Sequence, residues 1–155
     1  MIPPILSCLV GKTICDNPQQ QDHWSTRRRA ASLVAYICHQ YGKSYHTLQP
    51  RITKTLLRAF LDPGRPLTTQ FGAIIGLDKI GTEVTRVLIV PNIKFYTENI
   101  LQHALNSTNP LRVEEADRCK QALAVSECDN NSQYPLFFFF FILGCAETYC
   151  RPRIK

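Results

Sequence analysis

Gly11-Lys12-Thr13 is the first combination in this 155-residue chain that could do chemistry, because a phosphate-binding loop ends in these three residue types. That loop also needs a glycine five residues earlier, where this chain has Leu6. It also needs a preceding strand, which the sequence does not predict. We therefore do not expect a nucleotide site here.

The histidines and cysteines do not combine into a catalytic or metal-binding motif. Neither His-Glu-x-x-His nor Gly-x-Ser-x-Gly occurs, and the four histidines are scattered. The seven cysteines include no Cys-x-x-Cys pair, so a zinc site lacks its usual ligand spacing. Cys38 and Cys119 fall on apolar helix faces, where a thiol acts as a small hydrophobic group in a reducing intracellular compartment. We expect no enzyme activity, no metal, no cofactor and no small-molecule substrate.

Basic side chains are the strongest candidates for a binding function. Residues 1–61 carry eight Lys/Arg and two Asp, whereas residues 62–155 carry ten basic and ten acidic residues, so the net charge of +6 belongs to the first part. These side chains could form a solvated helix face, meet an acidic protein surface or contact DNA phosphates. No aromatic residues alternate with them, so any nucleic-acid binding should be sequence-blind. The candidate contact face consists of Arg27, Arg28, Arg29, Arg51, Lys54 and Arg58.

The elements that must position these residues are predicted to be helices. Residues 22–42 and 66–81 read as the same helix, 43 residues apart, because apolar positions match at the helical spacing i, i+4, i+7. A helical unit that recurs every 40 to 47 residues or so is typical of a HEAT-type α-solenoid, and such repeats bind partners. The chain has room for about three repeats. The matched pairs are Ala30 with Ala73, Val34 with Leu77 and Ile37 with Ile80.

Caps and periodicity define the helices further, and no strand is predicted. Gly72 and Gly76 lie four apart inside a helix, where each costs roughly 1 kcal/mol relative to alanine, which predicts a close helix–helix contact. After Thr82, residues Val84, Val87 and Leu88 mark the apolar face of a helix, and Pro91 should kink this segment. The predicted helices cover 5–14, 23–41, 49–61, 66–81, a segment from 82 through 88, 93–104, and a last helix from 110. The expected packing residues are Trp24, Ala30, Val34, Ile37, Gly72, Ala73, Gly76, Leu77 and Ile80.

The chain divides into a HEAT-like domain, 1–128, and an irregular phenylalanine-rich tail, 129–155. The tail contains five consecutive phenylalanines at 137–141, which fit neither helical nor alternating periodicity. It is either a buried terminal strand or helix, or not native coding sequence; we favour the second, because a pyrimidine-rich intron boundary translates as repeated phenylalanine. The first ten residues lack the basic start of a secretory signal, and the longest apolar stretch, 136–145, is about half of a membrane span. We expect no membrane association.

Several segments, in their order along residues 1 to 105, resemble one family. They include Asp22-His23-Trp24, Leu48-Gln49-Pro50-Arg51-Ile52, Phe71-Gly72-Ala73-Ile74-Ile75-Gly76-Leu77 and Leu88-Ile89-Val90-Pro91. The chain resembles the C-terminal HEAT-repeat domain of TFIID subunit 6. The resemblance implies a non-enzymatic scaffold in the nucleus, within the RNA polymerase II initiation machinery or a SAGA-type coactivator, with other TFIID subunits as partners. The family's separate N-terminal histone fold does not precede Met1, so pairing through it is not expected of this chain.

The chain departs from the family pattern near the start of helix 23–41. An acid and an aromatic are replaced by Arg28 and Arg29, which removes a buried ring and an ion-pair partner for Arg27. Because a buried arginine needs a partner, we expect looser packing at this turn. The remaining C-terminal repeats are also missing, which predicts marginal solubility. The alternative function is a sequence-blind DNA-binding module that uses the basic first half for contact with promoter DNA.

Overall fold

The computed structural model describes residues 2–15 and 21–128, and every element in these two ranges is helical. Short π-helical turns, Thr85–Ile89 and Thr97–Leu101, and a 3-10 turn, Val90–Asn92, connect α5 to α7. The all-α prediction is therefore confirmed, while the predicted tail, 129–155, lies outside the described residues. The helices are α1 (Ile2–Val10), α2 (His23–Tyr41), α3 (Leu48–Leu61), α4 (Leu67–Ile80), α5 (Thr82–Val84), α6 (Ile93–Tyr96), α7 (Gln102–Leu105) and α8 (Pro110–Cys128).

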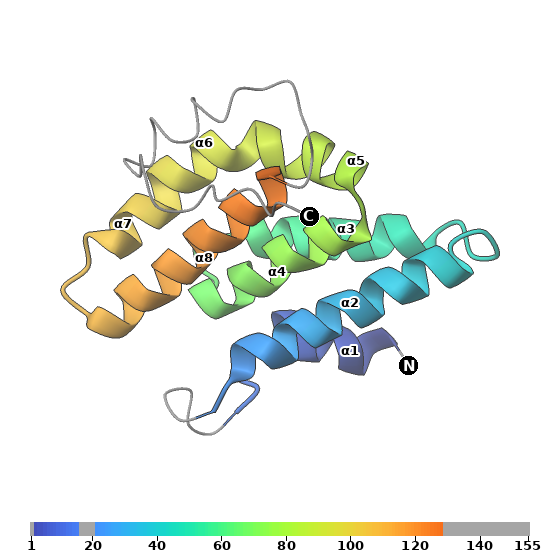
Figure 1. Cartoon of the computed structure of the whole chain (residues 1–155), viewed down its shortest axis with the longest axis horizontal. Coiled ribbons are helices and arrows are strands. Elements are labelled where there is room, and N and C mark those ends of the chain that lie inside the picture. Colours follow the sequence, from blue (N-terminus) through green and yellow to red (C-terminus); the bar gives the residue numbers. More distant parts are fainter. Residues whose placement is uncertain (1, 16–20, 129–155) are drawn as a thin grey trace, which may run out of the picture.

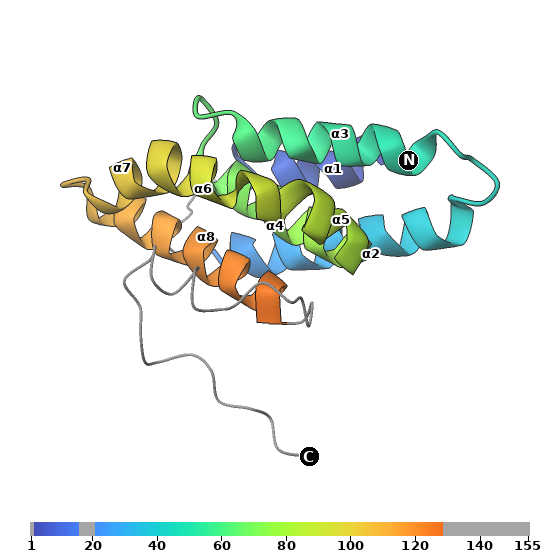
Figure 2. The same ribbon diagram turned by 90° about the horizontal axis from the view of Figure 1, so that it is seen from above.

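Helix α4 is the centre of the fold. It packs against α1, α2, α3 and α8, and α8, α4 and α2 lie side by side in that order (Figure 1). All residues of α4 from Leu67 to Leu77 are buried, which explains why this helix carries apolar residues on every face. Helices α1 and α3 and the α5–α7 segment form a second layer, so that α3 and α2 lie on opposite sides of α4 (Figure 2).

The 43-residue repeat extends to a third copy. Ala73 follows Ala30 by 43 residues, Ala116 follows Ala73 by 43 more, and all three side chains are buried in α2, α4 and α8 respectively. Each of these helices is paired with an outer partner: α1 with α2, α3 with α4, and the α5–α7 segment with α8. The fold is thus a HEAT-type solenoid of three repeats, as the sequence predicted.

Local capping explains where α2 begins, whereas α1 ends earlier than expected. The Asp22 carboxylate accepts a hydrogen bond from the Ser25 backbone N–H at 3.1 Å, and α2 starts at His23 as predicted. Helix α1 ends at Val10 and not at residue 14. The carbonyl of Gly11 bonds to side chains from other helices and does not continue the α-helical ladder.

The connection between α5 and α7 changes the predicted apolar face. Val87 was expected on the buried side but is 61% exposed, because it lies in a π-helical turn, whose wider spacing shifts the helical register. The kink predicted at Pro91 is present as the 3-10 turn, where the Asn92 side-chain amide donates to the Leu88 carbonyl at 2.8 Å. The chain therefore changes direction here without leaving that carbonyl free.

Candidate interaction surfaces

Arg27 does not belong to an exposed contact face, contrary to the prediction from sequence. Its side chain is 1% exposed, its Nη1 donates to the Leu9 carbonyl at 2.7 Å, and its Nη2 donates to the Gly11 carbonyl at 2.9 Å. Both carbonyls lie at the C-terminal end of α1, where backbone acceptors have no partner within the helix. A cation also interacts favourably with the partial negative charge of a helix C-terminus.

This arrangement corrects the expectation of loose packing at the start of α2. Burial lowers the pKa of the Arg27 guanidinium, but arginine remains charged at neutral pH. Backbone carbonyls take the place of the missing carboxylate, so the arginine holds α1 against α2. Arg29, which stands where the family has an aromatic residue, is exposed.

Gly72 allows the same end of α1 to approach α4. A β-carbon at Gly72 would overlap the carbonyl oxygen of Leu9, the acceptor of the Arg27 bond. A β-carbon at Gly76 would lie 3.0 Å from methyl carbons of both Leu9 and Leu56. The two glycines therefore sit under a close contact of α4 with α1 and α3, which offsets their low helix propensity.

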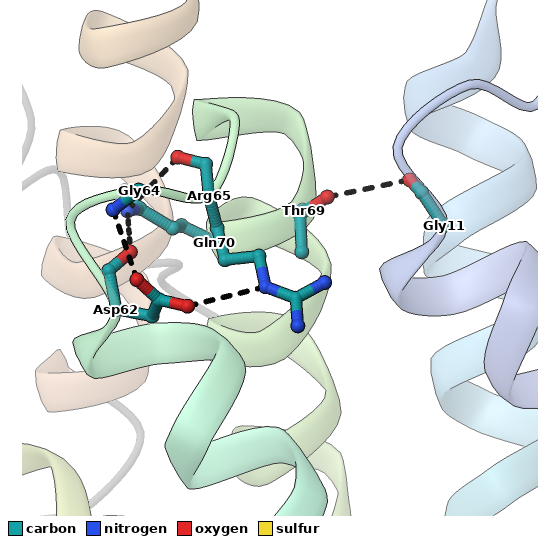
Figure 3. A network of polar contacts seen from close by, with 6 residues as sticks. All are labelled: Gly11, Asp62, Gly64, Arg65, Thr69 and Gln70. Atoms are coloured by element: carbon teal, nitrogen blue, oxygen red, sulfur yellow. Dashed lines mark hydrogen bonds and ion pairs between the residues drawn. The ribbon is translucent and has the colours of Figure 1, made fainter.

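Gln70 occupies the position in the second repeat that Arg27 occupies in the first, 43 residues earlier. It is fully buried, and its amide Nε2 donates to the carbonyls of Asp62 and Arg65 at 2.9 and 3.3 Å in the turn before α4 (Figure 3). Its Oε1 accepts a hydrogen bond from the Tyr96 hydroxyl at 3.0 Å. Two successive repeats thus use one buried polar side chain to bind the backbone that follows their outer helix.

A third polar contact joins the first two repeats, at the backbone that follows α1. The Thr69 hydroxyl donates to the Gly11 carbonyl at 3.4 Å (Figure 3). Because Arg27 also donates to this carbonyl, it has donors from both α2 and α4. Reasoning from sequence missed this polar set, although the 43-residue offset relates Arg27 to Gln70. Polar residues at matched positions of a repeat were the signal that could have found it.

Trp24, one of the expected packing residues, joins α2 to α4. The Trp24 ring meets the Phe71 ring edge to face, with centroids 4.8 Å apart, and the Arg118 guanidinium lies 5.5 Å from the indole centroid. Trp24 is thus placed against α4 and α8 at the start of α2. Ala30, Val34, Ala73, Leu77 and Ile80 are buried, whereas Ile37 is half-buried.

The five remaining basic candidates are exposed, but they form two faces and not one. Arg51, Lys54 and Arg58 lie on α3 at the helical spacing i, i+3, i+7. Arg28 and Arg29 lie on α2, on the other side of α4 (Figure 2). We name the first three residues the α3 basic face. Neither helix contains an acidic residue, so the charge on both is entirely positive.

The two buried thiols of the described residues, Cys38 and Cys119, are not activated. Burial raises the pKa of the Cys119 thiol to about 12 and also raises the pKa of Cys38, so both thiols stay protonated. Within residues 2–15 and 21–128, no group of three or more His, Cys, Asp or Glu side chains is placed to hold a metal ion. In the same ranges, no helix is both long enough and apolar enough to cross a bilayer.

Three stacked helical repeats with a shared apolar core define an α-solenoid of the HEAT class. Comparison with known proteins narrows this class to one family. The chain belongs to the family described as the TAF6 C-terminal HEAT repeat domain, whose model matches residues 1–94.

Relatives from distant organisms match most of the chain. It is 43% identical over 123 residues to the SAGA complex/transcription factor TFIID complex subunit Taf6 of Schizosaccharomyces pombe, covering 79% of this chain and 27% of that protein. It is 40% identical over 126 residues to the transcription initiation factor TFIID subunit 6 of Arabidopsis thaliana, covering 79% and 23%. The chain thus spans about a quarter of these relatives.

A solved structure shares the fold. The TAF6 C-terminal domain from Antonospora locustae superimposes with a TM-score of 0.59 at 28% identity, covering 77% of this chain and 54% of that chain.

Proposed function

We propose that this chain is a non-enzymatic scaffold module of a nuclear transcription initiation complex of the TFIID or SAGA type. It acts through contacts with other subunits of that complex. The observation that carries the proposal is the family membership, because the matched residues 1–94 include all of α1–α4 and hence the centre of the helical core. The names of the relatives supply the kind of complex.

The α3 basic face is our proposed contact with an acidic surface of another subunit. Arg51, Lys54 and Arg58 are exposed on a helix without acidic residues, and the helix rests on α4, which fixes its position. The same three residues favour the second candidate function, sequence-blind contact with promoter DNA. With three phosphate contacts, the logarithm of the binding constant falls with the logarithm of the salt concentration with a slope of about −2.7, and so few contacts would give weak binding at physiological salt.

The experiment that tests the proposal is co-purification of the tagged full chain from nuclear extract at about 150 mM salt. We expect other TFIID or SAGA subunits to co-purify, and their absence would overturn the scaffold function. The triple variant Arg51→Gln/Lys54→Gln/Arg58→Gln should reduce this recovery. The matched control, Lys79→Gln/Lys94→Gln/Arg112→Gln, removes the same charge from exposed residues elsewhere and should leave it unchanged.

DNA binding is measured on the same variants. The second candidate replaces the first if the wild-type chain binds a DNA duplex near physiological salt, the logarithm of its binding constant changes with the logarithm of the salt concentration with a slope of about −2.7, and the α3 triple variant does not bind. If subunits co-purify and no DNA binding is seen, the second candidate fails.

A further inference from the structure

The outer face of α2 carries a stripe of apolar and polar side chains that is separate from the α3 basic face. Arg29, Leu33, Tyr36 and Gln40 recur at i, i+4, i+7 and i+11, and all four are exposed. Leu33 is 46% exposed and Tyr36 is 61% exposed, whereas the buried residues of α2 lie on the opposite face. We name these four residues the α2 stripe.

Large exposed apolar side chains are concentrated in a stretch of sequence that overlaps this stripe. Eight such side chains occur among the described residues, and half of them, Leu33, Tyr36, Tyr41 and Tyr45, come from positions 33 to 45. Single exposed apolar residues are ordinary on protein surfaces, but a group rich in tyrosine and flanked by arginine has the composition of an interface. Tyrosine and arginine are also enriched among the residues that dominate binding energy.

The charge around the stripe selects the chemistry of a partner. Arg28 and Arg29 lie near its N-terminal end and Lys43 lies beyond its C-terminal end, while no acidic residue occurs between Asp22 and Asp62. The Arg28 guanidinium lies 5.3 Å from the centroid of the buried Phe71 ring of α4, so Arg28 borders the stripe on the side of α4 and Arg29 lies within the stripe. Electrostatic complementarity therefore requires negative charge on whatever covers this face.

The same observations disfavour the other occupants. A second copy of this chain would place one positive face against another, which is unfavourable in a symmetric interface. A nucleic-acid duplex would use the arginines but would leave Leu33 and Tyr36, at the middle of the stripe, against phosphates and sugars, because its bases are paired and stacked inside the double helix. A protein segment that presents both acidic and apolar side chains satisfies the whole face.

We propose that the α2 stripe docks an acidic amphipathic helix of a partner protein. Among the described helices, α2 ends the row α8, α4, α2, so a helix that lies along its outer face extends this row (Figure 1). The apolar side of the partner helix covers Leu33 and Tyr36, and its Asp or Glu side chains pair with Arg28 and Arg29. This inference rests on the proposed scaffold function, because it specifies the chemistry of one of the subunits bound.

Site-specific photo-crosslinking in the purified complex tests the occupant directly. The full chain carries the photoreactive residue p-benzoylphenylalanine in place of Tyr36 or, as the control, in place of Phe95, an exposed aromatic residue of α6. We expect the crosslink at position 36 to join an acidic segment with apolar residues at helical spacing, and the crosslink at 95 not to reach that segment. A crosslink from position 36 to DNA, to another copy of this chain or to a basic segment overturns the proposal.

This design separates the two proposals. If other subunits co-purify but position 36 crosslinks to nothing, the docking inference fails and the scaffold function stands. If no subunit co-purifies, the scaffold function itself fails.

A defined peptide tests the recognition chemistry in isolation. The probe is a 20-residue helical peptide with leucines at i, i+4, i+7 and i+11 and glutamates around them, and a scrambled peptide of the same composition is its control. We expect Leu33→Ala/Tyr36→Ala to weaken binding of the first peptide about tenfold, whereas Val87→Ala/Phe95→Ala, at exposed apolar residues of two other elements, leaves binding unchanged. Equal binding of the two peptides, or no loss in the α2 variant, overturns the inference. Because the substituted residues are exposed, unfolding midpoints should match those of the wild type.

Discussion

Replacement of Arg27 by methionine should destabilise the protein severely without touching any exposed surface. Methionine keeps much of the side-chain length but cannot donate to the carbonyls of Leu9 and Gly11. The Leu9 carbonyl is then left in a buried contact with Gly72, and the Gly11 carbonyl keeps only the 3.4 Å bond from Thr69. The end of α1 loses the side chain that attaches it to α2.

The size of the loss follows from this geometry. Hydrogen bonds from a charged donor contribute about 1.5–3 kcal/mol each, and two are removed. Part of this is offset, because burying the guanidinium is costly and its Nε has no hydrogen-bond partner. We therefore expect the free energy of unfolding to fall by about 3 kcal/mol, a large fraction of the stability of an ordinary domain.

Urea unfolding of the full chain, followed by circular dichroism at 222 nm, measures this difference. Arg29→Met is the matched control two residues further along α2, and because Arg29 is exposed we expect its effect to stay below about 0.5 kcal/mol. Arg27→Lys keeps the charge but not the planar pair of donors and should fall between the two. A loss below about 1 kcal/mol for Arg27→Met, at an unchanged denaturant slope, would refute the role of Arg27 as the anchor of α1.

Three further predictions use buried groups of the same core. Gly72→Ala should lower the free energy of unfolding by about 2 kcal/mol, because its β-carbon overlaps the α1 backbone, although alanine is the better helix former. Gly76→Ala meets only movable methyl groups and should change the free energy of unfolding by less than about 1 kcal/mol. Equal effects of the two variants in urea unfolding would contradict the close contact at Gly72. Gln70→Leu should cost about 2–3 kcal/mol in the same assay, because two turn carbonyls and the Tyr96 hydroxyl lose their partner, and a neutral result would mean that other groups satisfy them. Burial and the nearby Arg27 charge lower the pKa of His23 below 6.5, so the imidazole binds a proton more readily in the unfolded chain than in the folded one. The free energy of unfolding should therefore fall as the pH drops through about 6.5. His23→Gln should reduce this loss between pH 7.5 and 5.5, and an unchanged pH dependence would exclude His23 as its source.

Most of the fold was predictable because its determinants are local. Asp22 caps α2 through a residue three positions away, and apolar residues at helical spacing mark the buried faces. Val87 was misplaced because the π-helical turn around it has no simple sequence signal. This π-helical turn places Val87 on the surface and not in the core.

The candidate site was less predictable, because it depends on where helices lie relative to one another. Arg27, Arg28 and Arg29 are consecutive basic residues, but only Arg27 faces the end of α1, whose carbonyls lie 16 to 18 residues earlier in the chain. No local pattern distinguishes an arginine that anchors a backbone from one that meets solvent. Likewise, α2 and α3 each show a clear basic face, yet only the packing of both on α4 directs these faces to opposite sides.

Helix α2 performs a different task on each side, and this makes stability and binding separable. Arg27, on its inner side, holds α1 through two carbonyls, so its loss should act on folding. Leu33 and Tyr36, on its outer side, are exposed, so their loss should act on partner binding and leave unfolding nearly unchanged. If the outer variants also destabilised the isolated chain, the α2 stripe would be part of its core and not a surface kept for another protein. Unfolding and binding measured on the same pair of variants therefore decide whether the solenoid presents α2 to a partner.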